Sequence, residues 1–168
     1  MANDLATVDG REVGGLLDEH LEDFVTFMVG DQMFGTPILM VQDILMLEKI
    51  EPIPLAPPEV LGSINLRGRI VTVVDIRQRL GMPKSKENDQ DRKMMGVTIE
   101  QEHDLYTLMV DKIGDVLSVS TEMFEGNPST LDPAWSEFAL GVYRLEGQLM
   151  VVLDVARLLD IKTYAPSV

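Results

Sequence analysis

The stretch GSINLRGRIVTVVDIRQRL, residues 62–80, is the part of this chain from which the fold is best deduced. Two apolar runs lie on either side of an Arg-Gly-Arg tripeptide at 67–69, a pattern typical of a β-hairpin with a tight turn. After Asp75 the spacing predicts a short helix over 76–80, ended by a glycine. The hairpin brings arginine and asparagine side chains to one end of a β core. No nucleophile, acid–base pair or metal cluster accompanies them, which favours a recognition module over an enzyme.

Composition narrows the class of protein. At 168 residues the chain is long enough for one domain or for two small subdomains that share a core. The absence of cysteine excludes disulfides, thiolate metal sites and a cysteine nucleophile. The net charge of −14 argues against nucleic acid and against anionic membrane surfaces, because phosphate groups repel a surplus of carboxylates.

Three further classes of feature are not expected. No apolar run approaches the roughly 20 residues that a membrane-spanning helix needs, so we expect no direct membrane insertion. The N-terminus has no basic region before an apolar one, so no secretory signal is predicted. His20 and His103 each lack a second ligand at metal-binding spacing, and no phosphate-binding glycine motif occurs. Neither a metal nor a cofactor is therefore predicted.

The expected boundaries divide the chain into three parts. Residues 1–22 form a polar tail or a short amphipathic helix, with apolar residues at helical spacing as far as Phe24. Residues 23–161 form the folded domain, and 162–168 form a C-terminal tail. A polar loop or linker is expected at 84–93, KSKENDQDRK, which contains no apolar residue.

About ten short strands, with turn signals every 8–12 residues, predict an all-β sandwich or barrel. One helical turn is expected at 57–62, PPEVLG, because proline is tolerated at a helix start and glycine at its end. Another short helix is expected at 154–160. Outside the opening hairpin, strands or extended segments are expected at 24–29, 33–36, 48–54, 95–99, 105–110, 113–119, 140–145 and 148–153.

An internal repeat relates the hairpin to the C-terminal part of the chain. With an offset of 79 residues, Asp75 aligns with Asp154, and a turn glycine and an apolar strand precede each. The repeat favours two similar small barrels over one large sandwich, since a closed barrel leaves no exposed edge strand. Each aspartate is expected to cap the following helix by accepting a backbone N–H. The tripeptide Leu-Met-Val, at 39–41 and again at 108–110, extends the similarity upstream.

Differences between the two copies indicate where function lies. Arg67 aligns with Glu146, and Asn65 aligns with Arg144. A group that the scaffold needed for folding would be expected in both copies. The polar turn of the first copy therefore serves something local to it.

Two compatible interpretations apply to Arg67. It is either a turn arginine paired with a nearby carboxylate, or a side chain that orients a groove for another protein. Asp43 is the best candidate partner, because it is the lone charge between residues 38 and 47. A third interpretation, a small hydrolase with Asp43 and Asp75 as paired carboxylates, lacks a base, a metal or an oxyanion site elsewhere in the sequence.

The chain resembles the CheW family of chemotaxis coupling proteins over roughly residues 22–161. The fairly specific part is GSINLRG at 62–68, followed by IVTVVDIR at 70–77. The segment ILMVQDI at 38–44 also fits the family pattern, as do residues 27–35, 111–117 and 149–159. The sequence departs from the family at Asp43, where glutamate is usual, and at Thr72, where proline is common.

The resemblance implies a mainly β fold of two five-stranded SH3-like barrels with short helices, packed around a shared core and exchanging strands. It implies a non-enzymatic adaptor in the bacterial cytoplasm, at receptor arrays on the inner face of the membrane. Such adaptors join the cytoplasmic tips of methyl-accepting chemoreceptors to the regulatory domain of the histidine kinase CheA. The alternative is a CheW-like coupler in a non-chemotaxis receptor–kinase pathway, such as motility or development. By position in the family motifs, the partner-binding residues would be Ile38, Val41, Asp43, Gly62, Asn65, Arg67 and Gly68.

Overall fold

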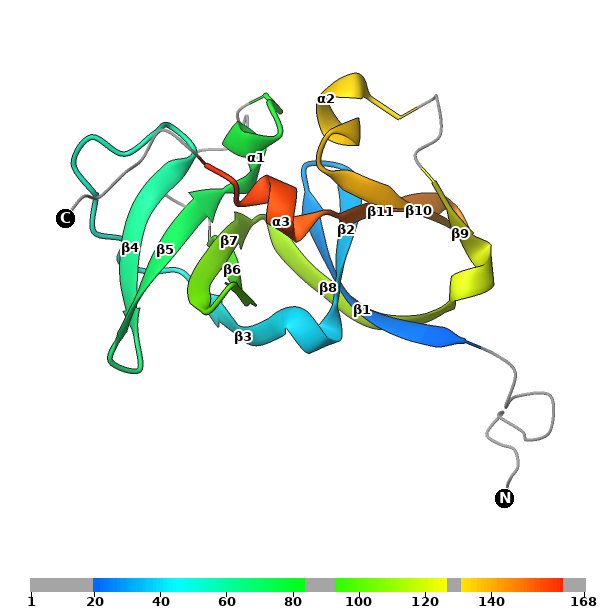
Figure 1. The fold of residues 1–168 in the computed structure, drawn as a ribbon, viewed down its shortest axis with the longest axis horizontal. Coiled ribbons are helices and arrows are strands. Elements are labelled where there is room, and N and C mark those ends of the chain that lie inside the picture. The colour runs from blue at the N-terminus through cyan, green and yellow to red at the C-terminus, as the bar shows by residue number, and fades with distance from the viewer. Residues whose placement is uncertain (1–19, 84–92, 127–130, 162–168) are drawn as a thin grey trace, which may run out of the picture.

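Eleven strands form two sheets in the computed structural model, which describes residues 20–83, 93–126 and 131–161. The two sheets lie side by side, with the short helix α3 between them (Figure 1). The strands are β1 (Leu21–Val29), β2 (Gln32–Pro37), β3 (Val41–Met46), β4 (Val60–Leu66), β5 (Arg69–Asp75), β6 (Met95–Gln101), β7 (Asp104–Val110), β8 (Lys112–Ser120), β9 (Phe124–Glu125), β10 (Ala139–Leu145) and β11 (Gln148–Leu153). The helices are α1 (Ile76–Arg79), α2 (Pro133–Ser136) and α3 (Val155–Leu158), with single 3-10 turns η2 (Ile38–Met40) and η4 (Thr121–Met123).

The two sheets have the same strand order. The first sheet runs β8-β1-β2-β11-β10-β9, and the second runs β3-β6-β7-β5-β4. Each contains one parallel pair, β2 with β11 and β5 with β7, and the other pairs are antiparallel. The two-residue strand β9 is an addition to the first sheet. Two five-stranded units of the same design, as predicted, are therefore present, and we call them the first and the second barrel.

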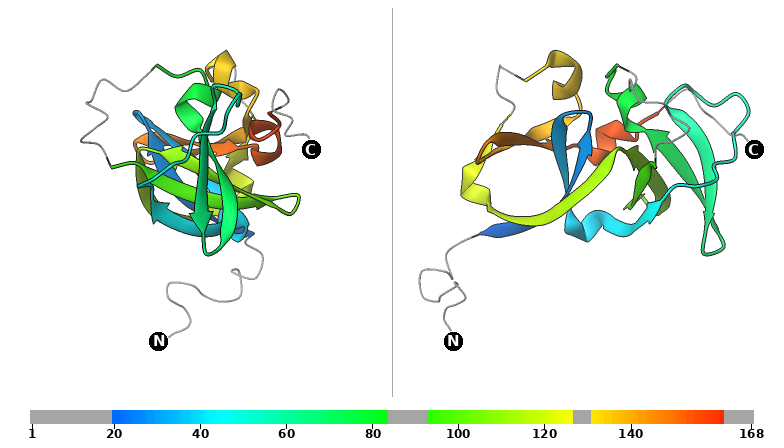
Figure 2. Two further views of the ribbon diagram at one scale, coloured as in Figure 1. Left: turned by 90° about the vertical axis from the view of Figure 1, so that its left-hand side faces the viewer. Right: turned by 180° about the vertical axis from the view of Figure 1, so that it is seen from behind.

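Neighbouring segments of the chain are exchanged between the barrels. Strand β3 follows β2 in the chain but joins the second sheet, and β8 follows β7 but joins the first. A view from behind shows both crossings, with β8 reaching along the first barrel and β3 leaving it (Figure 2). Strands from neighbouring stretches of the chain therefore lie in different sheets. Neither barrel is a continuous piece of the sequence.

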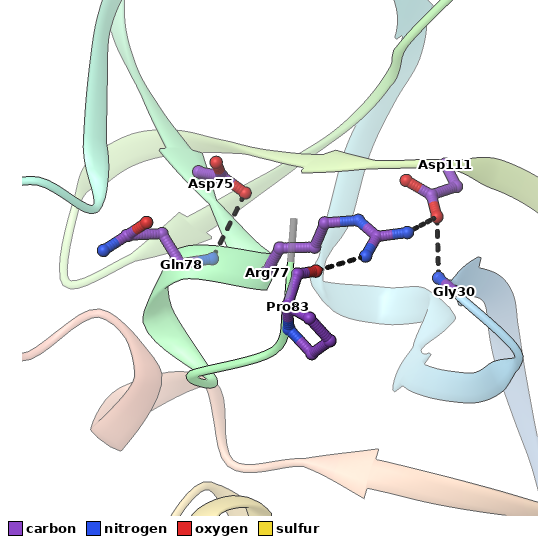
Figure 3. A network of polar contacts seen from close by, with 6 residues as sticks. All are labelled: Gly30, Asp75, Arg77, Gln78, Pro83 and Asp111. Atoms are coloured by element: carbon purple, nitrogen blue, oxygen red, sulfur yellow. Dashed lines mark hydrogen bonds and ion pairs between the residues drawn. The ribbon is translucent and has the colours of Figure 1, made fainter. Parts of the chain in front are cut away.

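The internal repeat is confirmed at the level of backbone geometry. The strand before Asp75 pairs with β4 through a register shift between Val60 and Gly62, and the same shift occurs 79 residues later in β10. Asp75 accepts a hydrogen bond from the Gln78 N–H through its carboxylate at 3.4 Å (Figure 3). The Asp154 carboxylate likewise accepts a hydrogen bond from the Arg157 N–H in the first turn of α3, at 3.2 Å. Both predicted helix caps are therefore present.

An apolar core is shared by the two barrels. Phe27 and Phe34 of the first barrel and Val74 and Leu108 of the second are fully buried in one cluster, which also includes Leu158 of α3. Each barrel also contains a smaller apolar cluster of its own. Burial of apolar area, at roughly 25 cal/mol per Å², is the main stabilising contribution in such an arrangement.

Several sequence predictions are wrong in detail. Residues 57–62 form a turn and the start of β4 rather than a helical turn, because the backbone from Val60 pairs with β5. An N-terminal helix does not reach Phe24, since β1 already begins at Leu21. Residues 39–41 lie in η2 and β3, whereas the matching tripeptide lies in β7, so this part of the repeat is coincidental. The short strand β9 was not predicted. Residues 1–19 and most of the predicted linker, 84–92, lie outside the described residues.

Candidate functional site

The polar turn of the β4–β5 hairpin is a two-residue turn. Arg67 and Gly68 both have positive φ angles, 53° and 86°, as a type I′ turn requires. Arg69, which was predicted to be part of the turn, is the first residue of β5. The Asn65 side-chain oxygen accepts a hydrogen bond from the Gly68 N–H at 2.9 Å. Asn65 therefore stabilises the turn that presents the arginine.

The predicted partner of Arg67 is found beside it. Arg67 Nη2 lies 3.0 Å from Asp43 Oδ2, with the two side chains 77% and 22% exposed. The other Asp43 oxygen accepts a hydrogen bond from the Ile44 N–H at 2.9 Å. The shorter aspartate side chain therefore spans the gap, and its carboxylate is oriented by its own backbone. The guanidinium remains largely open to a partner.

The chain that leads to Asp43 carries exposed apolar side chains. Ile38 is exposed in η2, and Val41 is half-buried against the shared core at the start of β3. Sequence reasoning did not single out Leu39, which is 91% exposed, or the exposed Ile44 of β3. The exposure of Ile44 could have been predicted from the sequence. Side chains alternate between the two faces of a strand, and in β3 Gln42, Ile44 and Met46 lie on the outward face. We call Ile38, Leu39, Ile44 and Met46 the apolar row.

Gly62 allows two backbone segments to approach one another closely in this region. It is buried in β4 with a φ angle of 150°, and a Cβ atom there would lie 2.2 Å from the Glu51 carbonyl oxygen. The Glu51 backbone also exchanges two hydrogen bonds with Ser63, at 2.9 Å and 2.8 Å. A glycine is therefore needed where the β3–β4 connection crosses β4 closely. Because Gly62 is buried, its contribution is to backbone shape rather than to direct contact with a partner.

The two carboxylates of the hydrolase interpretation have separate structural roles. Asp43 pairs with Arg67, whereas Asp75 caps α1. Burial raises the pKa of Asp75 above its ordinary value of 3.8, and the Gln78 N–H opposes this shift in part. Among the residues that the structure describes, no group of three or more acidic or histidine side chains could hold a metal ion. Asp43 and Asp75 are therefore each held by a different structural partner.

A turn arginine braced by a carboxylate, together with exposed apolar side chains in η2 and β3 of the same double barrel, defines a protein-recognition module. A model of the CheW-like domain matches residues 23–162, and the chain therefore belongs to the CheW-like family. The resemblance inferred from the hairpin is thus confirmed. Within the ranges that we describe, no helix has the length and apolar character needed to cross a membrane.

Individual relatives agree with the family model. The chain is 32% identical over 133 residues to the chemotaxis protein CheW of Rhizobium meliloti strain 1021, covering 79% of this chain and 84% of that protein. It is 27% identical over 157 residues to the chemotaxis protein CheW of Treponema pallidum strain Nichols, covering 93% and 92%. The crystal structure of the scaffolding protein TtCheW from Thermoanaerobacter tengcongensis matches with a TM-score of 0.76 at 21% identity, over 86% and 97% of the two chains. That structure has the same fold.

Proposed function

We propose that this protein is a non-enzymatic adaptor that couples methyl-accepting chemoreceptors to the histidine kinase CheA in chemotaxis. Membership of the CheW-like family supports the proposal, as do relatives named chemotaxis protein CheW that match over most of their length. Those names favour chemotaxis over another motility or developmental pathway. The partners are the cytoplasmic tip of the receptor and the regulatory domain of the kinase. The working location is therefore the cytoplasm, at receptor arrays on the inner face of the membrane.

The observation that carries the proposed binding site is the exposed Asp43–Arg67 pair, with exposed apolar side chains in η2 and β3, the segment that includes Asp43. An exposed guanidinium held by a carboxylate can donate hydrogen bonds to a partner, since it presents up to five donors in a fixed geometry. Exposed apolar side chains of η2 and β3 would supply the desolvated part of such an interface. We assign direct contact to Ile38, Val41, Asp43 and Arg67. Asn65, Gly62 and Gly68 act by shaping the hairpin.

The adaptor acts by differential binding. It shifts kinase activity only if it binds the active and inactive states of its partners with unequal affinity. The unit that performs this role is the domain over residues 23–161, with β1 extending it by two residues to Leu21.

The test is a three-way reconstitution with a receptor-tip fragment and the kinase. We expect Arg67→Ala and Asp43→Ala each to weaken assembly and to reduce receptor control of kinase activity. Arg144→Ala is the matched control, because Arg144 forms a similarly exposed ion pair with Glu125 in the first barrel. Unchanged assembly and control in both Arg67→Ala and Asp43→Ala would show that the site assignment is wrong. Failure of the unmodified protein to bind either partner would overturn the proposed function itself.

A further inference from the structure

One carboxylate oxygen is held by groups from both barrels. Asp111 Oδ2 accepts a hydrogen bond from the Gly30 N–H at 2.6 Å and another from Arg77 Nη2 at 2.7 Å (Figure 3). Gly30 lies in the β1–β2 turn of the first barrel, whereas Arg77 lies in α1, directly after β5 of the second. Asp111 is the single residue between β7 and β8, where the chain passes from the second barrel to the first.

The contact is buried and its geometry is well defined. The Arg77 and Asp111 side chains are 16% and 6% exposed. The other terminal nitrogen of Arg77 donates to the Pro83 carbonyl oxygen at 2.7 Å, so the guanidinium plane is held from two sides (Figure 3). Gly30 has a φ angle of 63°, which directs the turn toward this contact without a side chain between them.

A second arginine of the same short helix also reaches the first barrel. Arg79 Nε donates to the Leu158 carbonyl oxygen at 2.7 Å, and Nη2 donates to the Arg157 and Asp160 carbonyl oxygens, each at 3.1 Å. These carbonyls lie in the last turn of α3 and just after it, where helix carbonyl groups have fewer partners within the helix. The Arg79 guanidinium also lies over the Phe138 ring, 4.7 Å from its centroid. Helix α1 therefore contacts two separate parts of the first barrel.

Polar and apolar contacts contribute differently to such a junction. The shared core, with Phe34 and Leu108 from different barrels, favours contact but is non-directional. A buried ion pair adds little net stability, because its desolvation cost offsets much of its attraction. Charge-assisted hydrogen bonds, however, require one geometry. The polar contacts are therefore suited to select one relative orientation among those that the apolar core permits.

We propose that Arg77, Asp111 and Arg79, which we call the α1 clamp, fix the orientation of one barrel relative to the other. They are positioning residues, and none belongs to the proposed binding site. The consequence for signalling rests on the proposed function, because a fixed orientation keeps the surfaces of the two barrels in one relative geometry. The orientation itself can be measured without any partner.

The experiment uses the absence of cysteine from the natural chain. Spin labels at Glu100→Cys in β6 and Gln148→Cys in β11, both exposed strand positions, report the distance between the barrels. The test variant is Arg77→Met with Asp111→Asn, which removes both charges but keeps an acceptor for the Gly30 N–H. We expect its distance distribution to broaden, or its mean to shift by more than the width of the unmodified distribution. A distribution identical to that of the unmodified protein would overturn the proposal.

Controls separate orientation from stability and from function. Arg144→Met with Glu125→Gln removes an ion pair of the same 2.7 Å length within the first barrel, and the distance distribution is expected to stay unchanged. If the double variant fails to fold, Arg77→Gln provides the same test with less disruption, and an unchanged distribution there also overturns the proposal. In reconstitution, the clamp variant should bind receptor tip and kinase singly but lose receptor control in the three-way complex. If the unmodified protein binds neither partner, the proposed function fails while the distance result stands.

Discussion

The Arg67 guanidinium lies 3.0 Å from the Asp43 carboxylate, although β3 and β4 are the two opposite edges of one five-stranded sheet. This contact is possible only because the sheet curls until its edges meet. The hairpin that carries Arg67 stands at the end of the molecule, as the end-on view in Figure 2 shows. The ion pair therefore links the turn between β4 and β5 to the edge strand β3.

The Asp43–Arg67 pair is expected to matter more for binding than for folding. Because Arg67 is largely exposed, a double-mutant cycle of Asp43→Ala and Arg67→Ala should give a coupling energy below about 1 kcal/mol. Urea denaturation measures the four free energies of unfolding, and the Arg144–Glu125 pair is the matched cycle. A coupling energy of about 2 kcal/mol or more would show that the pair is mainly a structural contact.

Substituting the two turn glycines of the repeat should distinguish an effect on folding from an effect on partner binding. Gly68 and Gly147 have φ angles of 86° and 81°, and nothing lies within 4 Å of a Cβ atom added at either. Alanine at each should therefore lower the free energy of unfolding by a similar amount, about 1–2 kcal/mol. Only Gly68→Ala should also weaken assembly with receptor tip and kinase. Equal loss of assembly in Gly147→Ala would argue against a site at the first hairpin.

Gly62→Ala should be more damaging than either turn substitution. The added Cβ would lie 2.2 Å from the Glu51 carbonyl oxygen, and the φ angle of 150° is one that side-chain-bearing residues rarely adopt. We expect a loss of more than about 2 kcal/mol in the free energy of unfolding, because strain and overpacking add. Thermal and urea denaturation measure this loss. A variant as stable as Gly68→Ala would contradict the close approach of the two backbones.

Asp75 should make stability depend on pH. Burial raises its pKa in the folded state above 3.8, so its contribution is fully present below that value and is lost as pH rises through the raised pKa. Asp75→Asn keeps an acceptor for the Gln78 N–H but does not titrate. Its stability relative to the unmodified protein should therefore increase with pH across this window and then level off. Urea denaturation at a series of pH values measures the difference, and a constant difference would contradict the prediction.

A companion variant isolates the helix cap. Asp75→Ala removes the acceptor at every pH, so it should lower the free energy of unfolding by about 1 kcal/mol relative to Asp75→Asn. Equal stability of these two variants would mean that the cap contributes nothing. The same comparison at Asp154, which caps α3, tests whether the two copies behave alike.

Much of the fold could be predicted because its signals are local. The alternation of apolar residues, the turn glycines and the capping aspartates each depend on neighbours within a few positions, and the structure contains them. The repeat could be seen because Asp75 and Asp154 occupy the same place in equivalent strand–helix units. The prediction of a helical turn at 57–62 was wrong, because the pairing of β4 with β5 outweighs the weak local preference for a helix.

Only part of the candidate site could be predicted from the sequence. Asp43 stood out as the one charge in an apolar segment, and it does meet Arg67. The apolar row was missed, since an apolar residue such as Leu39 is normally taken as core until its neighbours in space are known. The sequence comparison predicts a functional role for Asn65. The structure adds a structural role, because the Asn65 side-chain oxygen accepts a hydrogen bond from the Gly68 N–H within the turn.

By itself, the sequence determined most of the strands, the helices capped by Asp75 and Asp154, the repeat and the family to which the chain belongs. Only the tertiary structure decided which strands cross between barrels, which apolar side chains remain exposed and which groups meet at the junction. Asp111 joins Gly30 and Arg77, which are 81 and 34 positions away in the chain. Contacts of this kind leave no local pattern, because they exist only after both barrels have closed and packed against one another.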